Sequence, residues 1–276
     1  MGANAALPAV RELAANADVI LAIGTELGET DYDVVFDGGF HLNGTLIRID
    51  LDPEQLVRNQ RTTLGLVGDA GRSLELLLAH FPDTLQRNGV ERTAEVLSTL
   101  NLQNDPAFSA FVPLYKTLAE YLPEAILVGD STAPVYAGNH LVSQPAPRCY
   151  FNASTGYGTL GYGLPAALGA QLGRPDLSVV ALVGDGGVMF TLSEIATAVE
   201  ERLPIVIVLW HNAGFEEIRR YMDANGVARL GVDIQAPNFL TLAEGFGCPG
   251  VLVESPVELA NALANREANG PLLIEN

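Results

Sequence analysis

The chain has 276 residues, 48% of them hydrophobic, which is enough to bury one large core or two modest ones and argues against disorder. A formal net charge of −18 repels phosphate backbones and anionic lipid, so we expect neither nucleic acid nor a membrane as a partner. Two cysteines and four histidines show no metal-site or redox spacing, and no apolar run reaches membrane-spanning length, so we expect a protein of the reducing cytoplasm.

The first 81 residues alternate between helical and strand patterns, which predicts a parallel sheet. The expected elements are a helix over residues 5–17, a buried strand at Asp18–Gly24, strands at Thr45–Asp50 and Leu64–Val67, and a helix at Ala70–His80. Three strands preceded by one helix make a small sheet. We therefore interpret residues 1–81 as the later part of an α/β middle domain.

Residues 82–106 are rich in proline, glycine and asparagine, and we interpret them as a linker with one short helix at Arg92–Leu100. Residues 107–276 then predict a second α/β domain. Helices are expected at 108–121, 163–172, 192–202, 238–245 and 256–267, and strands at 125–128, 177–183, 204–210, 250–253 and 272–275.

Two polar clusters in this second domain each follow an apolar strand, at Gly184–Gly187 and at His211–Gly214. The carboxyl ends of parallel strands form the edge of an open sheet where ligands bind. The glycines at Gly184–Gly187 allow backbone N–H groups to approach an anion. Asp185, Asn212 and the Gly214 carbonyl are hard oxygen donors suited to Mg²⁺. By itself, Gly-Asp-Gly is most often only a turn, and an asparagine after a strand is usually a cap or turn residue.

The residues between the clusters give them a context. Asp185 is followed by Glu194-Ile-Ala-Thr-Ala198, Leu203-Pro204 and His211-Asn212. This order resembles the C-terminal domain of thiamine-diphosphate enzymes of the acetolactate synthase and 2-oxo acid decarboxylase family. That family has Gly-Asp-Gly, then Glu-Leu-x-Thr-Ala, Leu-Pro and Asn-Asn. Ile195 and His211 depart from it, but the family's metal ligand is the second asparagine.

A second segment, Gly156–Gly169, resembles the family's Gly-Leu-Gly-x-Met-Gly-Phe-Gly-Leu-Pro-Ala-Ala block. The resemblance implies that the Gly158 carbonyl and Leu160 N–H meet the aminopyrimidine ring, with Leu160 as the apolar wedge that bends the cofactor. Thr132 corresponds to a residue that binds the terminal phosphate, although a helix cap for residues 133–141 explains it equally well. The implied cofactors are thiamine diphosphate and Mg²⁺, held by Thr132, Gly158, Leu160, Gly184, Asp185, Gly186, Gly187, Asn212, Gly214 and Phe215.

The front of the chain resembles the later half of the family's middle domain, through Ala17–Gly28, Ile49–Pro53 and Gly68-Asp69. Acetolactate synthases hold FAD in this domain, but Gly24–Gly28 is not a dinucleotide fingerprint, so we do not expect flavin. The resemblance does not include the family's N-terminal domain, which carries the glutamate that activates the aminopyrimidine. We therefore expect no catalytic side chain here, no turnover by this chain alone, and a homo-oligomer or a partner chain that supplies that domain.

The segment after Asn212 is expected to lie over the substrate, and its adjacent acids Glu216 and Glu217 suit a substrate with a distal cation. Together with Phe151–Tyr162, this segment resembles 5-guanidino-2-oxopentanoate (2-ketoarginine) decarboxylases. Glu216 and Glu217 could equally form helix-surface pairs with Arg219 and Arg220.

The predicted function is thiamine-diphosphate- and Mg²⁺-dependent decarboxylation of a 2-oxo acid, with 5-guanidino-2-oxopentanoate as a candidate substrate. Two alternatives stay open: an acetolactate synthase-like carboligase, and a non-catalytic remnant that binds cofactor or another subunit. A nucleotide-binding oxidoreductase is disfavoured because no Gly-x-Gly-x-x-Gly opens a helix after a strand.

Overall fold

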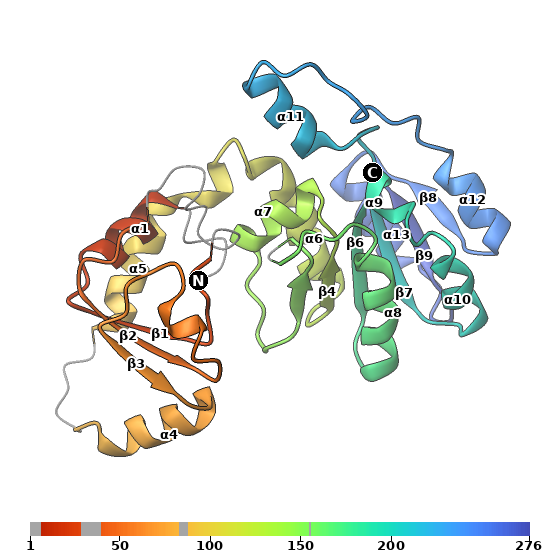
Figure 1. Ribbon diagram of the computed structural model, residues 1–276. Helices are drawn as coiled ribbons and strands as arrows, with labels where there is room; N and C mark the ends of the chain where they lie inside the picture. The colour runs from red at the N-terminus through yellow and green to blue at the C-terminus, as the bar shows by residue number, and fades with distance from the viewer. Residues whose placement is uncertain (1–6, 29–39, 83–87, 155) are drawn as a thin grey trace. The chain divides into compact units, whose positions relative to one another are not determined.

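The computed structural model describes residues 7–28, 40–82, 88–154 and 156–276, and it forms two units, Met1–Asn101 and Leu102–Asn276 (Figure 1). Both units are α/β structures in which the strands pair in parallel, which confirms the expected fold class. The first two residues of the expected opening helix, 5 and 6, and linker residues 83–87 lie outside the described part. Among the described residues, no helix combines the length and apolarity needed to cross a bilayer.

Within its described residues, the first unit has a three-stranded sheet in the order β1-β2-β3 and three α-helices. Its elements are α1 (Pro8–Ala15), β1 (Val19–Ile23), β2 (Thr45–Asp50), β3 (Leu64–Val67), α4 (Ala70–His80) and α5 (Gly89–Leu100). Strand β1 was expected to be buried, and that expectation is wrong. Ala22 packs into a small core, but Val19 is 60% exposed and Leu21 43%. Successive side chains of a strand point to opposite faces, and only one face of β1 is covered.

The second unit is built on a six-stranded sheet in the order β5-β4-β6-β7-β9-β8. The strands are β4 (Ile126–Gly129), β5 (Tyr150–Asn152), β6 (Val179–Gly184), β7 (Ile205–Trp210), β8 (Gly250–Leu252) and β9 (Leu272–Glu275). The helices are α6 (Val112–Tyr121), α7 (Ala133–Leu141), α8 (Gly163–Gly173), α9 (Asp185–Val188), α10 (Glu194–Glu200), α11 (Glu216–Ala224), α12 (Phe239–Phe246) and α13 (Pro256–Ala264).

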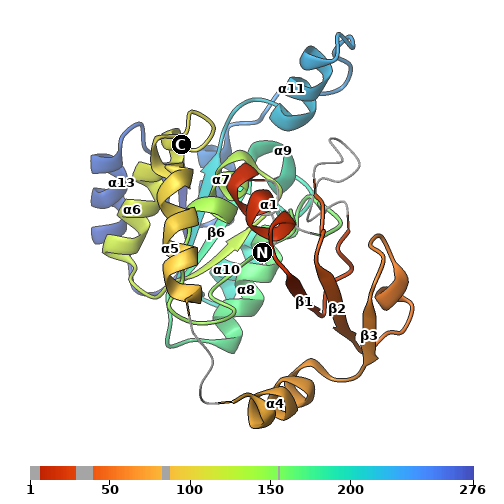
Figure 2. The ribbon, with the colours of Figure 1, turned by 90° about the vertical axis from the view of Figure 1, so that its left-hand side faces the viewer.

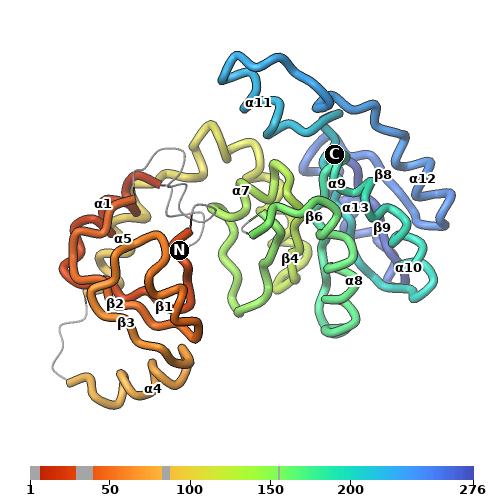
Figure 3. The backbone as a smooth tube through the Cα atoms, viewed as in Figure 1, coloured from red at the N-terminus to blue at the C-terminus, as the bar shows by residue number. Residues whose placement is uncertain are grey.

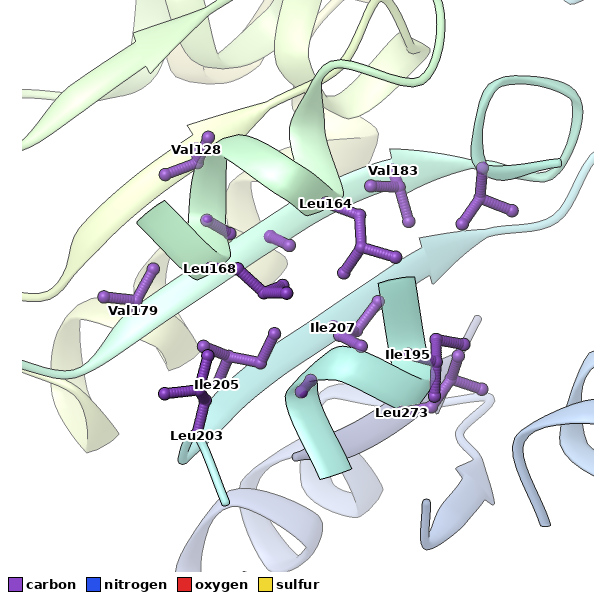
Figure 4. Packing of buried hydrophobic residues seen from close by; sticks show 14 of the residues in the cluster. Val128, Leu164, Leu168, Val179, Val183, Ile195, Leu203, Ile205, Ile207 and Leu273 are labelled. Atoms are coloured by element: carbon purple, nitrogen blue, oxygen red, sulfur yellow. The ribbon is translucent and has the colours of Figure 1, made fainter. Parts of the chain in front are cut away.

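Helices cover both faces of this sheet, giving three layers (Figure 2). Helices α8, α10 and α12 pack on one face, and α6, α7 and α13 pack on the other. The central strands β6 and β7 are apolar along almost their whole length because both of their faces are buried. In β6, Val179 and Val183 face one helical layer while Val180 and Leu182 face the other. Figure 4 shows Leu164 and Leu168 of α8 and Ile195 of α10 against the first of these faces.

The carboxyl ends of neighbouring strands bring the polar segments of the sequence to one edge of the sheet. Residues 130–132 follow β4, residues 185–187 follow β6, and residues 211–215 follow β7. Because these strands are adjacent, three segments far apart in sequence are neighbours in space. After β7 the chain runs through α11 and a long connection before it returns to α12 (Figure 3).

Candidate functional site

A cavity of about 450 Å³ opens at this edge of the second unit. All twelve residues that the sequence singles out for cofactor, metal or substrate line it: Thr132, Gly158, Leu160, Gly184, Asp185, Gly186, Gly187, Asn212, Gly214, Phe215, Glu216 and Glu217. The structure thus brings the three predicted motifs together around one space. Their individual roles stay predictions.

Asp185 and Asn212 supply buried oxygens at adjacent strand ends. The Asp185 side chain is 3% exposed, and its two oxygens accept the backbone N–H groups of Gly186 at 2.8 Å and Asn212 at 3.2 Å. The Asn212 Oδ1 atom is buried and has no hydrogen-bond partner among the described residues. An unpaired buried acceptor beside a buried carboxylate is unfavourable unless a cation or donor joins it. The donor set therefore fits a hard divalent cation such as Mg²⁺.

No group of three or more acidic, histidine or cysteine side chains gathers as a metal site within the described ranges. One carboxylate, one amide oxygen and one backbone carbonyl would leave several positions of a Mg²⁺ octahedron open. Ligand oxygens and water would fill the remaining coordination positions of such a cation. Proteins commonly hold Mg²⁺ on a phosphorylated ligand in this way.

The loop that carries Asn212 is fixed from several sides. Ala213 has a φ of +53°, a conformation that costs energy for a residue with a side chain. The Arg219 guanidinium donates to the Asn212 carbonyl at 3.1 Å and pairs with Glu216 and with Asp233. These contacts brace the loop without using the Asn212 side-chain oxygen.

Close packing explains why position 186 is a glycine. A Cβ atom there would lie 2.6 Å from the Phe215 ring, so the ring packs directly on the backbone of the Gly184–Gly187 turn. A larger residue would displace the Phe215 ring from this position. This contact links the turn after β6 to the segment after β7.

Thr132 occupies the N-cap position of α7, but its side chain makes no capping hydrogen bond. Thr132 thus stands at the cap position expected for residues 133–141, without the side-chain hydrogen bond that a capping threonine usually makes. Its side chain is close to Gly184, where an added Cβ would lie 2.8 Å from the Thr132 Oγ1 atom. The hydroxyl is placed beside the glycine turn and on the cavity wall.

The glycine-rich segment opens α8 and includes Gly158, whose φ of +63° favours glycine. Asp130 anchors this segment. Its carboxylate is fully buried and accepts the N–H groups of Ser131 and Gly161, each at 2.8 Å. Burial raises the pKa of Asp130, and the backbone N–H groups it accepts partly offset that rise. Asp130 therefore ties the turn after β4 to the loop that carries Leu160.

Glu216 and Glu217 differ in their partners although they are adjacent. Glu216 pairs with Arg219 and with Arg220 at 3.1 Å, and the Arg219 hydrogen bond holds its pKa below the usual range. Within the described residues, no ion pair involves Glu217. Burial, and next to it the charge of Glu217, raise the pKa of Tyr136, which also lines the cavity. The helix-pair interpretation thus applies to Glu216, whereas Glu217 is a solvent-exposed residue at the cavity wall with no ion-pair partner among the described residues.

Sequence reasoning missed several lining residues, namely Ser131, Ala133, Tyr136, Ser154, Ile218 and Tyr221, together with the anchor Asp130. Asp130 had a visible signal, because it directly follows an apolar strand on the same sheet edge as Asp185. Tyr136, Ile218 and Tyr221 lie in the first two turns of α7 and α11, where spacing alone does not distinguish a cavity wall from a surface.

Two family models match the chain. Residues 129–276 match the model described as "Thiamine pyrophosphate enzyme, C-terminal TPP binding domain", and residues 1–77 match "Thiamine pyrophosphate enzyme, central domain". Thiamine pyrophosphate is another name for thiamine diphosphate.

Curated relatives include a probable 2-ketoarginine decarboxylase, AruI, of Pseudomonas aeruginosa, 36% identical over 241 residues that cover 86% of this chain and 42% of the relative. A probable acetolactate synthase large subunit of Methanocaldococcus jannaschii is 30% identical, covering 99% of this chain and 48% of the relative. The chain thus spans somewhat less than half the length of these relatives. A Rhodococcus jostii thiamine diphosphate-dependent 4-hydroxybenzoylformate decarboxylase shares the fold, with a TM-score of 0.72 and 24% identity, covering 96% of this chain and 50% of that one.

Proposed function

Because the chain belongs to the family of thiamine-diphosphate-dependent enzymes that includes 2-oxo acid decarboxylases and acetolactate synthases, we propose that it serves the Mg²⁺-dependent decarboxylation of a 2-oxo acid with a cationic side chain. The candidate substrate is 5-guanidino-2-oxopentanoate. The observation that carries the proposal is a single cavity with Asp185 and the unpaired Asn212 oxygen on its wall and the unpaired Glu217 carboxylate also lining it.

Asp185, Asn212 and the Gly214 carbonyl would hold the metal, and Thr132 with the N–H groups of Gly184–Gly187 would bind the diphosphate. The metal offsets the repulsion between an anionic ligand and a chain of net charge −18. Gly158 and Leu160 would meet the aminopyrimidine, as the family resemblance implies. When bound, thiamine diphosphate supplies the nucleophile and electron sink that decarboxylation requires.

Glu217 supports a cationic substrate. A carboxylate without a protein partner at the wall of a partly enclosed cavity can form a charge-assisted, two-point pair with a guanidinium. Glu216 already has two arginine partners, so it would act by holding Arg219 against the Asn212 loop. The relative named as a probable 2-ketoarginine decarboxylase agrees with this choice of substrate.

The metal-linked part of the proposal is tested by calorimetric titration of thiamine diphosphate with Mg²⁺ present, with chelator, and with the Asp185→Asn variant. Removing a charged metal ligand is expected to weaken cofactor binding at fixed Mg²⁺ by about tenfold or more, which is roughly 1.4 kcal/mol. Chelator should have a similar effect on the unmodified chain.

Glu217→Gln is the matched control, because it removes an acid from the same cavity away from the metal donors. It should keep the Mg²⁺ dependence. Equal cofactor affinity in all conditions and variants would contradict a metal held by Asp185.

A further inference from the structure

Asp130 is a fully buried residue that lies behind the cavity of the second unit and is not one of the lining residues. It directly follows β4, and its backbone N–H donates to the Leu182 carbonyl of β6 at 2.9 Å, so the sheet fixes its main chain. A buried carboxylate is unfavourable unless its oxygens accept hydrogen bonds. The groups that contact its two oxygens therefore show which segments depend on it.

One oxygen of Asp130 contacts two segments of the cavity wall. The Oδ2 atom accepts the Gly161 N–H at 2.8 Å, and a Cβ atom added to Gly187 would lie 2.9 Å from the same oxygen. The Oδ1 atom accepts the Ser131 N–H at 2.8 Å, which fixes the rotation of the carboxylate. Gly161 directly follows Leu160 in the glycine-rich segment, and Gly187 ends the glycine turn after β6. The carboxylate thus joins the Leu160 segment to the glycine turn.

The Gly161 peptide unit is also held by Thr191, whose hydroxyl donates to the Gly161 carbonyl at 3.0 Å. Gly161 has a φ of +81°, and a Cβ atom there would lie 2.8 Å from the Phe190 Cβ atom, so the position excludes a side chain. Thr191 lies four residues after Gly187 on the chain that leaves β6. Both hydrogen-bonding groups of Gly161 are therefore bonded to residues that follow the central strands.

From these contacts we infer that Asp130 is a positioning residue for thiamine diphosphate, because it sets the separation between the Leu160 segment and the glycine turn. The inference rests on the proposed function, in which the Leu160 segment meets the aminopyrimidine and the glycine turn binds the diphosphate. A ligand that binds two segments at once gains affinity from the second only when their separation matches its own length. Asp130 would therefore act on the part of the affinity that comes from binding both ends together.

A simpler role for Asp130 is to satisfy backbone N–H groups at the start of α8. Burial raises the pKa of Asp130, and the N–H groups of Tyr162 and Gly163 are among those that oppose the rise. This role predicts lower stability for a variant and an equal loss of affinity, or none, for every ligand of the cavity. Positioning predicts that thiamine diphosphate is weakened while inorganic diphosphate, which is too short to reach the Leu160 segment, is not. The ratio of the two affinities separates the roles.

The test is calorimetric titration of the unmodified chain and its variants with thiamine diphosphate and with inorganic diphosphate, at one Mg²⁺ concentration. Asp130→Asn has nearly the size of the native residue, but its amide nitrogen would face the N–H of Ser131 or of Gly161. It should reduce the affinity ratio about 10-fold, the size expected when one buried N–H loses its acceptor. Thr191→Val removes the bond to the Gly161 carbonyl and should shift the ratio in the same direction. It replaces Asp130→Asn if that variant does not fold.

Gln171→Leu is the matched control at the other end of α8. Gln171 is buried outside the cavity lining, and its side-chain amide donates to the Arg174 and Leu177 carbonyls at 3.3 Å and 3.1 Å. This variant should lower the melting temperature and leave the affinity ratio unchanged.

The inference is overturned if the Asp130 and Thr191 variants lower only the melting temperature, or if they weaken both ligands by the same factor. An unmodified chain that binds thiamine diphosphate no more tightly than inorganic diphosphate would instead contradict the proposed ring contacts of Gly158 and Leu160, and this inference with them.

Discussion

At the scale of single residues, Glu216 and Glu217 show how adjacent identical side chains acquire different chemistry. Glu216 is neutralised by Arg219 and Arg220, whereas Glu217 lines the cavity with no ion pair among the described residues. The sequence offered both as substrate ligands and left helix-surface pairing as an alternative. Spacing could not decide, because Arg219 and Arg220 lie at i+3 and i+4 from Glu216 and at i+2 and i+3 from Glu217.

In an enzyme preparation competent for turnover, Glu217→Gln should lower kcat/KM for 5-guanidino-2-oxopentanoate about 10- to 100-fold relative to pyruvate, which corresponds to a lost charge-assisted pair of roughly 1.5–3 kcal/mol. Glu216→Gln should leave the ratio of the two substrates near its original value, because that carboxylate contacts arginines. The measurement is the specificity ratio from initial rates of carbon dioxide release. A ratio unchanged by Glu217→Gln would argue for a substrate without a distal cation.

His140, in the last turn of α7, links pH to stability. Burial lowers its pKa below the usual value of about 6.5, and the charge of Asp105 only partly opposes this. The unfolded chain therefore binds a proton more readily at this residue than the folded one. The corresponding stability is fully present above the unfolded value of about 6.5, and it is lost progressively as the pH falls from there through the lower folded pKa.

Denaturant unfolding at pH 7.5 and 5.5 tests this, with fluorescence of Trp210, the single tryptophan, reporting on the second unit. His140→Gln should lose less stability on acidification than the unmodified chain. An identical loss in both proteins would show that other groups set this pH dependence.

At the scale of elements, β7 is the strand on which the second unit most depends, because it lies between β6 and β9 with helices on both faces. Ile207 is fully buried in its centre. Ile207→Ala should lower the free energy of unfolding by about 2–5 kcal/mol through lost burial and a cavity. Trp210 at the end of the strand reports the transition. Val257→Ala in α13, where Val257 is 70% exposed, is the control and should change stability by less than about 0.5 kcal/mol.

Elements with long apolar or strongly periodic stretches were predictable from the sequence. The expected bounds of β2, β3, α4 and β9 agree with the structure. The three-residue strand β5 was not predicted, because it lies between a proline-rich segment and a glycine-rich one and depends on pairing with β4. Helix α9 was interpreted as a turn, since Gly186 and Gly187 are poor helix formers. The prediction that β1 is buried was wrong because the apolarity of a strand does not show which of its faces are covered.

The residues of the site likewise divide into those that the sequence predicts and those that only tertiary packing brings to the cavity. Strand ends, glycine density and the family resemblance identified residues that the structure brings together around one cavity. Residues that reach the cavity through tertiary packing, such as Tyr136, carry no local pattern. Contacts set by sheet order carry no local pattern either. His211 and Glu275 are 64 residues apart in sequence, and only the order of the strands makes them neighbours.

At the scale of the whole molecule, these 276 residues match less than half the length of the relatives. The family resemblance puts the activating glutamate in a domain outside the matched part. A purified polypeptide of these residues, with thiamine diphosphate, Mg²⁺ and a panel of 2-oxo acids, is therefore expected to release carbon dioxide far below the rate of about 1 per second typical of enzymes. Activity should appear when an N-terminal domain of a relative is added as a separate chain. Turnover at enzyme rates without it would contradict the expectation.

The open face of the first unit has a consequence for handling the protein. Strand β3 stands at one end of its sheet with Leu64, Leu66 and Val67 between 42% and 62% exposed, and Leu76 and Leu78 of α4 are exposed by 51% and 70%. An apolar strand at the end of a sheet is a template for aggregation. The net charge of −18 makes copies of the chain repel each other. Added salt shortens the range of that repulsion to about 10 Å at 0.1 M. Solubility should therefore be greatest in dilute, low-salt buffer, and salting-out steps during purification would favour precipitation.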